Sequence, residues 1–91
     1  MISRDVVFSD RYGLHPRSAH RIGQALADTL AKVTIQHLAA GTPPIDARSL
    51  LALIGSGIGA GDQVRVTADG PDEGSVLTSI AALLEGGVCH P

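Results

Sequence analysis

Aromatic residues are almost absent from this chain, which has one Phe, one Tyr and no Trp among 91 residues. Its core must therefore be aliphatic, and its 44% of hydrophobic residues is too high a share for a disordered chain. A single cysteine excludes an internal disulfide and favours a reducing, cytoplasmic setting. No apolar run is long enough to insert into a membrane, and the start of the chain lacks the apolar segment of a signal peptide. The formal net charge of −2 argues against nucleic acid as the main partner.

The pattern of apolar residues divides the chain into short strands and helices. Alternation predicts strands at residues 33–38 and 63–68. The run Val6-Val7-Phe8, without Gly or Pro nearby, predicts another at 2–8, and two prolines limit segment 42–45 to a short edge strand. Steps of three and four predict helices at 16–32, at 47–54 after an Asp46 cap, and between Pro71 and Gly86. The order is β-α-β-β-α-β-α, and it favours a sheet with one solvated face and its helices on the other.

Each predicted helix has one apolar face. The three faces are, in chain order, Ala19, Ile22, Ala25, Leu26 and Leu30; then Leu50, Leu51 and Ile54; and finally Val76, Leu77, Ile80, Leu83 and Leu84. In the second strand, Val33, Ile35 and His37 share one face.

A histidine directly before a helix-opening proline is the sharpest candidate for chemistry. Proline is favoured at the first helical position and keeps the preceding residue extended, which places His15 at the cap. Histidine is an unusual cap, but a helix N-terminus attracts anions. A neutral imidazole is a nucleophile near neutral pH, and the guanidinium of Arg17 can hold a phosphate by two bonds. This pattern indicates a histidine that carries a phosphoryl group; the alternative is a surface histidine that happens to precede a helix.

The other patterns are less specific. The glycine-rich run 55–61 follows a helix and leads into a strand, so we interpret it as a helix end and turn rather than a nucleotide loop. Ser49 by itself is an ordinary polar residue near a helix start, and Arg48 beside it is interpreted as a solvated charge. No metal site is expected, because the spacing of the remaining candidates matches no zinc pattern: His20, His37, Cys89 and His90.

With these motifs in hand, the chain resembles the HPr family, the histidine-containing phosphocarriers of the bacterial sugar phosphotransferase system. Residues 13–17 match the phosphohistidine signature Gly-Leu-His-x-Arg, and residues 46–51 match the signature around a regulatory serine. Gly57-Ile58 and the Gly61-Asp62 turn also follow the family pattern. The resemblance implies one HPr-like domain over residues 1–91. Its α+β fold would be an open-faced β-sandwich, with three helices on one face of a four-stranded antiparallel sheet.

The resemblance also implies roles for individual residues. His15 would accept a phosphoryl group at Nδ1 from phosphoenolpyruvate-loaded enzyme I and pass it to an enzyme IIA domain, while Arg17 stabilises the phosphorylated state. Ser49 would be the position that an HPr kinase/phosphorylase modifies in bacteria that have one. The chain would then be a cytoplasmic phosphoryl carrier, monomeric and without a cofactor, rather than an enzyme with its own turnover.

Partners are expected to dock where helix 1 meets the start of helix 2, on an apolar patch with a few basic residues that suits a transient interface. The candidates are Arg17, His20, Arg21, Gln24, Leu50, Leu51 and Ile54. Family members often carry lysines on this face, and here Gln24, Ala27 and Ala52 fill such places.

One departure from the family concerns the phosphate itself. The family commonly has proline directly after the arginine, whereas here Ser18 stands there and the proline is Pro16. Pro16 has no N–H to donate to a phosphate. We expect the N–H groups of Arg17 and Ser18, together with the Ser18 hydroxyl, to hold it instead.

Two alternatives to the sugar-transport role stay open at this point. The first is an HPr-like relay in a regulatory branch, either nitrogen-related or serving dihydroxyacetone kinase. The second is a binding module that keeps the fold but is never phosphorylated and acts on its partners by contact alone.

Overall fold

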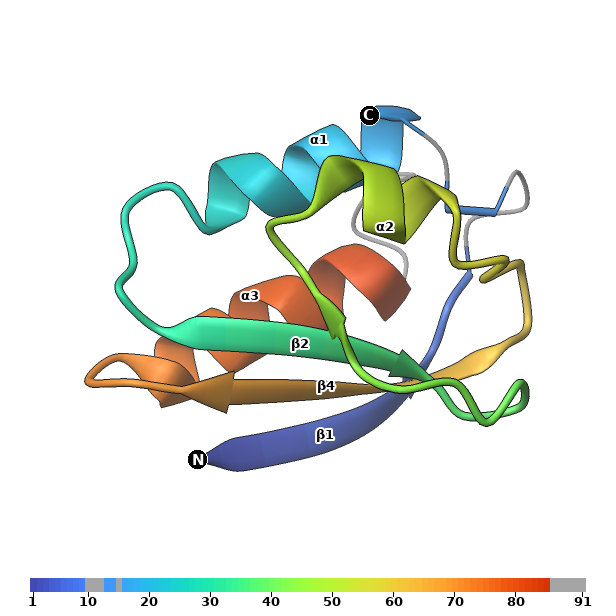
Figure 1. Cartoon of the computed structure of the whole chain (residues 1–91). Coiled ribbons are helices and arrows are strands. Elements are labelled where there is room, and N and C mark those ends of the chain that lie inside the picture. Colours follow the sequence, from blue (N-terminus) through green and yellow to red (C-terminus); the bar gives the residue numbers. More distant parts are fainter. Residues whose placement is uncertain (10–12, 15, 86–91) are drawn as a thin grey trace.

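The computed structural model describes residues 1–9, 13–14 and 16–85, and these residues have the predicted order of elements. In chain order they form β1 (Ile2–Val7), α1 (Pro16–Ala25), β2 (Lys32–His37), β3 (Ile45–Asp46), α2 (Leu50–Ile54), β4 (Gln63–Asp69) and α3 (Glu73–Glu85) (Figure 1). Among the described residues, no helix is long and apolar enough to cross a membrane.

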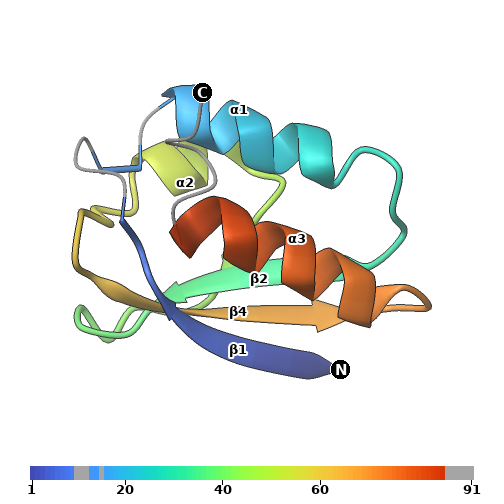
Figure 2. The same cartoon turned by 180° about the vertical axis from the view of Figure 1, so that it is seen from behind.

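The strands form one antiparallel sheet in the order β1-β4-β2-β3. Val6 lies opposite Val64 between β1 and β4, and Ile35 lies opposite Val66 between β2 and β4. The short β3 lies at the edge, as the prolines before it predicted. The described helices all lie on one side of this sheet (Figures 1 and 2), so the expected α+β fold with one open face is confirmed.

The two faces of the sheet differ as the alternation predicted. On the helix side, Val33, Ile35, Val64 and Val66 are completely buried, together with Phe8. On the open side, the guanidinium of Arg65 donates to both carboxylate oxygens of Asp5, at 2.7 and 3.1 Å. This hydrogen bond lowers the pKa of the Asp5 carboxyl below its ordinary value.

The first helix is shorter than predicted. It ends at Ala25 instead of residue 32, and the chain then turns over residues 26–28. Leu26 is still buried, but Ala25 is exposed and Leu30 is 92% exposed, so both assignments to the apolar face were wrong. The physical reason is the reversal into β2: Thr29 accepts the N–H of Ala31 and donates to Asp72, and these contacts fix a turn where periodicity alone continued the helix.

The second helix also starts later than predicted. Asp46 belongs to β3, and its Oδ1 accepts the N–H of Arg48 at 2.9 Å; the N-cap of α2 is Ser49. With this start, the buried residue of α2 is Leu53, whereas Leu50 and Leu51 are 47% and 83% exposed. The apolar side that the sequence assigned to this helix, Leu50, Leu51 and Ile54, is therefore largely exposed, although Ile54 packs against the core in part.

The last helix agrees with the sequence pattern. Val76, Leu77, Ile80 and Leu84 are buried, and Leu83 is partly buried against the core. Ala81, which was not assigned to the face, is also buried. The predicted end of the helix at Gly86-Gly87 lies outside the described residues, as does most of the predicted turn before residue 13.

Gly70 joins β4 to α3 at a place where no side chain fits. A Cβ atom there would lie 2.6 Å from the Cα of Ala31, which belongs to the backbone and cannot rotate away. We predict that Gly70→Ala lowers the free energy of unfolding by about 1–3 kcal/mol, as overpacking does. The matched control is Gly74→Ala, because a Cβ at Gly74 in α3 meets nothing within 4 Å and helix propensity favours alanine. Urea denaturation of both variants measures the difference, and equal midpoints would contradict it.

Candidate functional site

The described residues next to His15 are fixed by the rest of the fold, while His15 itself lies outside the described residues. Leu14 is buried, and its N–H donates to the carbonyl of Ile58 at 3.0 Å. The chain then enters α1 at Pro16, the first helical position as predicted. The segments before and after the histidine are thus held by a loop contact and by a helix.

Gly13 is required by this arrangement. Its φ of +76° is a conformation that residues with a side chain rarely adopt. A Cβ atom there would also lie 3.2 Å from the carbonyl oxygen of Ile58, the atom that accepts from Leu14. The glycine of the first signature therefore permits the close approach of two backbones.

The glycine-rich run 55–61 ends α2 and turns the chain, as predicted. Gly55 is the C-cap of α2 and donates its N–H to the carbonyl of Leu51 at 3.0 Å. The sequence pattern did not show that the same loop holds Leu14 through Ile58, because that contact joins residues 44 positions apart.

The first turn of α1 exposes one of the predicted site residues and buries another. Arg17 is exposed, in agreement with a role at the surface. Ser18 is completely buried, on the side of α1 that also buries Ala19 and Ile22.

Ser49 begins α2 and is half-buried. Its Oγ accepts the N–H of Ala52 at 3.3 Å, and its backbone φ and ψ of −87° and 101° are typical of a cap. Sequence analysis placed Ser49 in the first helical turn, and the structure moves it to the position just before that turn.

Arg48 is exposed, as the sequence suggested, but its guanidinium also makes hydrogen bonds to three backbone carbonyls. One guanidinium nitrogen donates to the carbonyl of Ala31 at 2.8 Å, and the other donates to the carbonyls of Thr29 at 2.8 Å and Leu26 at 3.2 Å. A cation suits carbonyls at the end of a helix, where they lack intrahelical partners. Arg48 thus fastens the start of α2 to the turn that follows α1.

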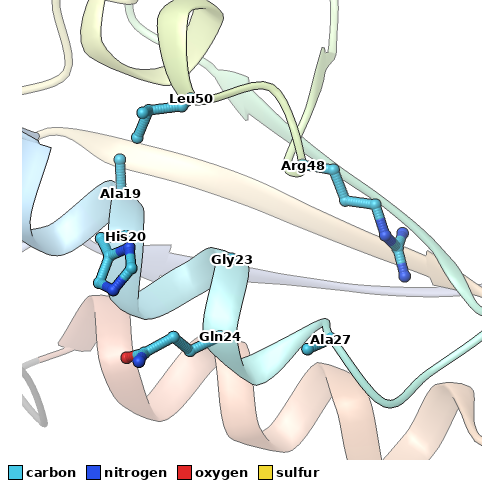
Figure 3. A pocket seen from close by; sticks show the side chains of 7 residues that line it. All are labelled: Ala19, His20, Gly23, Gln24, Ala27, Arg48 and Leu50. Carbon is cyan, nitrogen blue, oxygen red and sulfur yellow. The ribbon is translucent and has the colours of Figure 1, made fainter.

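A shallow hollow of about 320 Å³ lies between α1 and the start of α2, with Leu50 above Ala19 at one end and Arg48 at the other (Figure 3). It brings together three of the predicted docking residues, His20, Gln24 and Leu50. Arg21 and Leu51 do not line it, and Ile54 packs partly against the core. The full lining is Ala19, His20, Gly23, Gln24, Ala27, Arg48 and Leu50.

The described residues contain no group of three His, Cys, Asp or Glu side chains that could hold a metal ion. Instead, the structure places His37 beside a carboxylate: its Nε2 lies 2.9 Å from Oδ2 of Asp62. The alternation in β2 correctly put His37 on the buried face. It could not reveal Asp62, which precedes β4 in a different part of the chain.

Comparison with known proteins identifies the family to which this sequence is similar. The family described as "PTS HPr component phosphorylation site" matches residues 2–86. The phosphocarrier protein HPr of Cupriavidus necator is 26% identical over 84 residues, which cover 92% of this chain and 91% of that protein. The multiphosphoryl transfer protein of Salmonella typhimurium is 25% identical over 97% of this chain, but this chain spans only 23% of that larger protein.

A solved structure agrees with the described fold. HPr-C-His from Thermoanaerobacter tengcongensis superposes with a TM-score of 0.87 over 100% of this chain and 99% of that one. The two sequences are 20% identical, so this likeness is one of fold.

The three carbonyl contacts of Arg48 lead to a prediction about stability. Arg48→Ala should lower the free energy of unfolding by about 1–2 kcal/mol, because hydrogen bonds to a charged donor are lost and the carbonyls of Thr29 and Ala31, between α1 and β2, lose their partner. Arg48→Lys should recover only part of this, since one ammonium cannot reproduce the planar fork. Chemical denaturation of both variants tests this. An Arg48→Ala protein with the same free energy of unfolding as the wild type would contradict the prediction and show that water replaces the guanidinium.

Proposed function

Because this chain belongs to the HPr family of phosphocarrier proteins of the phosphotransferase system, we propose that His15 accepts a phosphoryl group from enzyme I and passes it to enzyme IIA domains. The observation that carries the proposal is the arrangement of the residues around His15. Leu14 is tied to the Ile58 carbonyl, and α1 begins at Pro16. Because His15 directly precedes Pro16 in the sequence, we propose that its imidazole works beside the N-terminus of α1, whose dipole favours an anion.

The transfer itself needs no metal in this proposal. The Nδ1 lone pair of a neutral imidazole forms a bond to phosphorus while the bond between phosphorus and the donor enzyme breaks. The second transfer repeats this exchange with the acceptor as nucleophile. The exposed Arg17 is proposed to offer its cation to the phosphate oxygens, and the N–H groups of Arg17 and Ser18, together with the Ser18 hydroxyl, are proposed to hold them. The chain is in this view a cytoplasmic carrier, monomeric and without its own turnover.

Docking of both partners is proposed at the hollow and its rim. Leu50 and Leu51 are exposed apolar side chains, and His20 and Arg21 lie nearby on α1. An interface of this kind is suited to short-lived complexes, because a carrier has to leave each partner quickly.

Ser49 is proposed as the position of regulatory modification by an HPr kinase/phosphorylase. A phosphate there adds roughly −1.5 to −2 charges near neutral pH. This charge would lie directly beside Leu50, which lines the docking hollow. Partners that are complementary to this face when Ser49 is unmodified would then bind less well.

Phosphorylation by enzyme I tests the central proposal. Incubation with enzyme I and labelled phosphoenolpyruvate should give an acid-labile, base-stable phosphate that is lost in His15→Ala. Thr78→Ala, which changes an exposed residue of α3, is the control and should keep the label. A wild-type protein that takes up no label would contradict the carrier function and favour a binding module that acts by contact alone.

Pro16 leads to a second prediction at the same site. Pro16→Ala restores a backbone N–H at the start of α1 and should raise the yield or the lifetime of the phosphorylated form about fivefold, the effect of one hydrogen bond of about 1 kcal/mol. Pro43→Ala, in an exposed segment before β3, is the matched control and should change neither. Equal hydrolysis rates and yields for the two variants would count against a missing amide at this helix.

A further inference from the structure

The imidazole of His37 is a buried polar group that the proposed function does not use. It ends β2 with a side chain only 9% exposed. Neither ring nitrogen has a hydrogen bond within the described part of the chain, and buried polar groups rarely lack one without a reason. The carboxylate of Asp62 lies 2.9 Å from Nε2, so the contact is a close electrostatic one whose direction is not that of a hydrogen bond.

Asp62 in turn holds the turn that precedes β4. Its Oδ2 accepts the N–H of Gly59 at 2.8 Å, and its backbone N–H donates to the Gly59 carbonyl at 3.0 Å. Its carbonyl accepts the N–H of Phe8 at 2.9 Å, and Gly61 donates to the Phe8 carbonyl at 2.7 Å. These bonds fix the turn 59–62 to the end of β1, and the contact with His37 fixes it to the end of β2.

The same turn determines where the Ile58 carbonyl lies. Ile58 is adjacent to Gly59 and is 5% exposed. Its carbonyl accepts the N–H of Leu14, which immediately precedes His15 in the chain. A displacement of the turn would move this acceptor and loosen the backbone in front of the histidine.

We propose that His37 is a positioning residue for phosphoryl transfer: its contact with the Asp62 carboxylate fixes the turn 59–62, and through it the Ile58 carbonyl that holds Leu14. The inference rests on the proposed function of His15. The contact between the imidazole and the carboxylate is screened less by water in this half-buried place than it would be at an open surface. His37 acts at a distance and does not touch the phosphate.

Hydrogen exchange at the Leu14 amide measures this coupling directly in the full chain. His37→Leu fills the buried space without a charge, and Asp62→Asn keeps an oxygen for the Gly59 N–H but removes the carboxylate. In each variant we expect Leu14 to exchange roughly tenfold faster relative to the Val66 amide in β4, the size of effect that a charged contact supports. The double variant should show little further change, because both substitutions remove the same contact.

The matched control is Arg65→Gln, which removes an exposed ion pair on the open side of the sheet and should leave Leu14 unchanged. The rate constant of phosphoryl transfer from enzyme I should fall with the faster exchange, while KM stays the same. Unchanged exchange at Leu14, equal acceleration at Leu14 and Val66, or an unaltered transfer rate would overturn the positioning role. The exchange measurement uses unphosphorylated protein, so its outcome is separate from a failure of wild-type labelling, which would contradict the proposed function.

Discussion

The hydrogen bond from the Leu14 N–H to the Ile58 carbonyl is the interaction on which the site depends. It joins the backbone just before the first helix to the loop that follows the second helix, in addition to the hydrogen bonds between Phe8 and the turn at Gly61 and Asp62. Gly13 permits the approach, since a side chain there would strain the backbone and crowd the same carbonyl. The glycine-rich loop therefore ends α2 and also holds, through the Ile58 carbonyl, the backbone just before His15.

Much of the fold could be predicted from the sequence because local patterns and burial agree. Alternation identified β2 and β4, and the run Val6-Val7-Phe8 identified β1, within one residue at each end, and the prolines correctly placed β3 at the edge. The errors lie where a side chain overrides periodicity. Thr29 fixes a turn in which Leu30 is exposed, and Ser49 rather than Asp46 caps α2, which moves burial onto Leu53.

The residues of the candidate site could be proposed from the sequence, whereas the contacts that hold the chain around them could not. The two signatures indicated His15 and Ser49, and family membership agrees with the phosphocarrier interpretation. The contacts of Arg48 and the pair of His37 and Asp62 are long-range, so no spacing in the sequence reveals them. Both contacts use polar groups to fix one loop against another, while Leu50 and Leu51 remain exposed.

The account depends most directly on where a phosphoryl group is carried. Phosphorus-31 and nitrogen-15 NMR of the protein after incubation with enzyme I and phosphoenolpyruvate measures this at the level of one atom. We predict a phosphorus–nitrogen bond at Nδ1 of His15, with the Leu14 amide still protected by its bond to Ile58. A phosphate on another residue, or a spectrum identical to that of the untreated protein, would contradict the account.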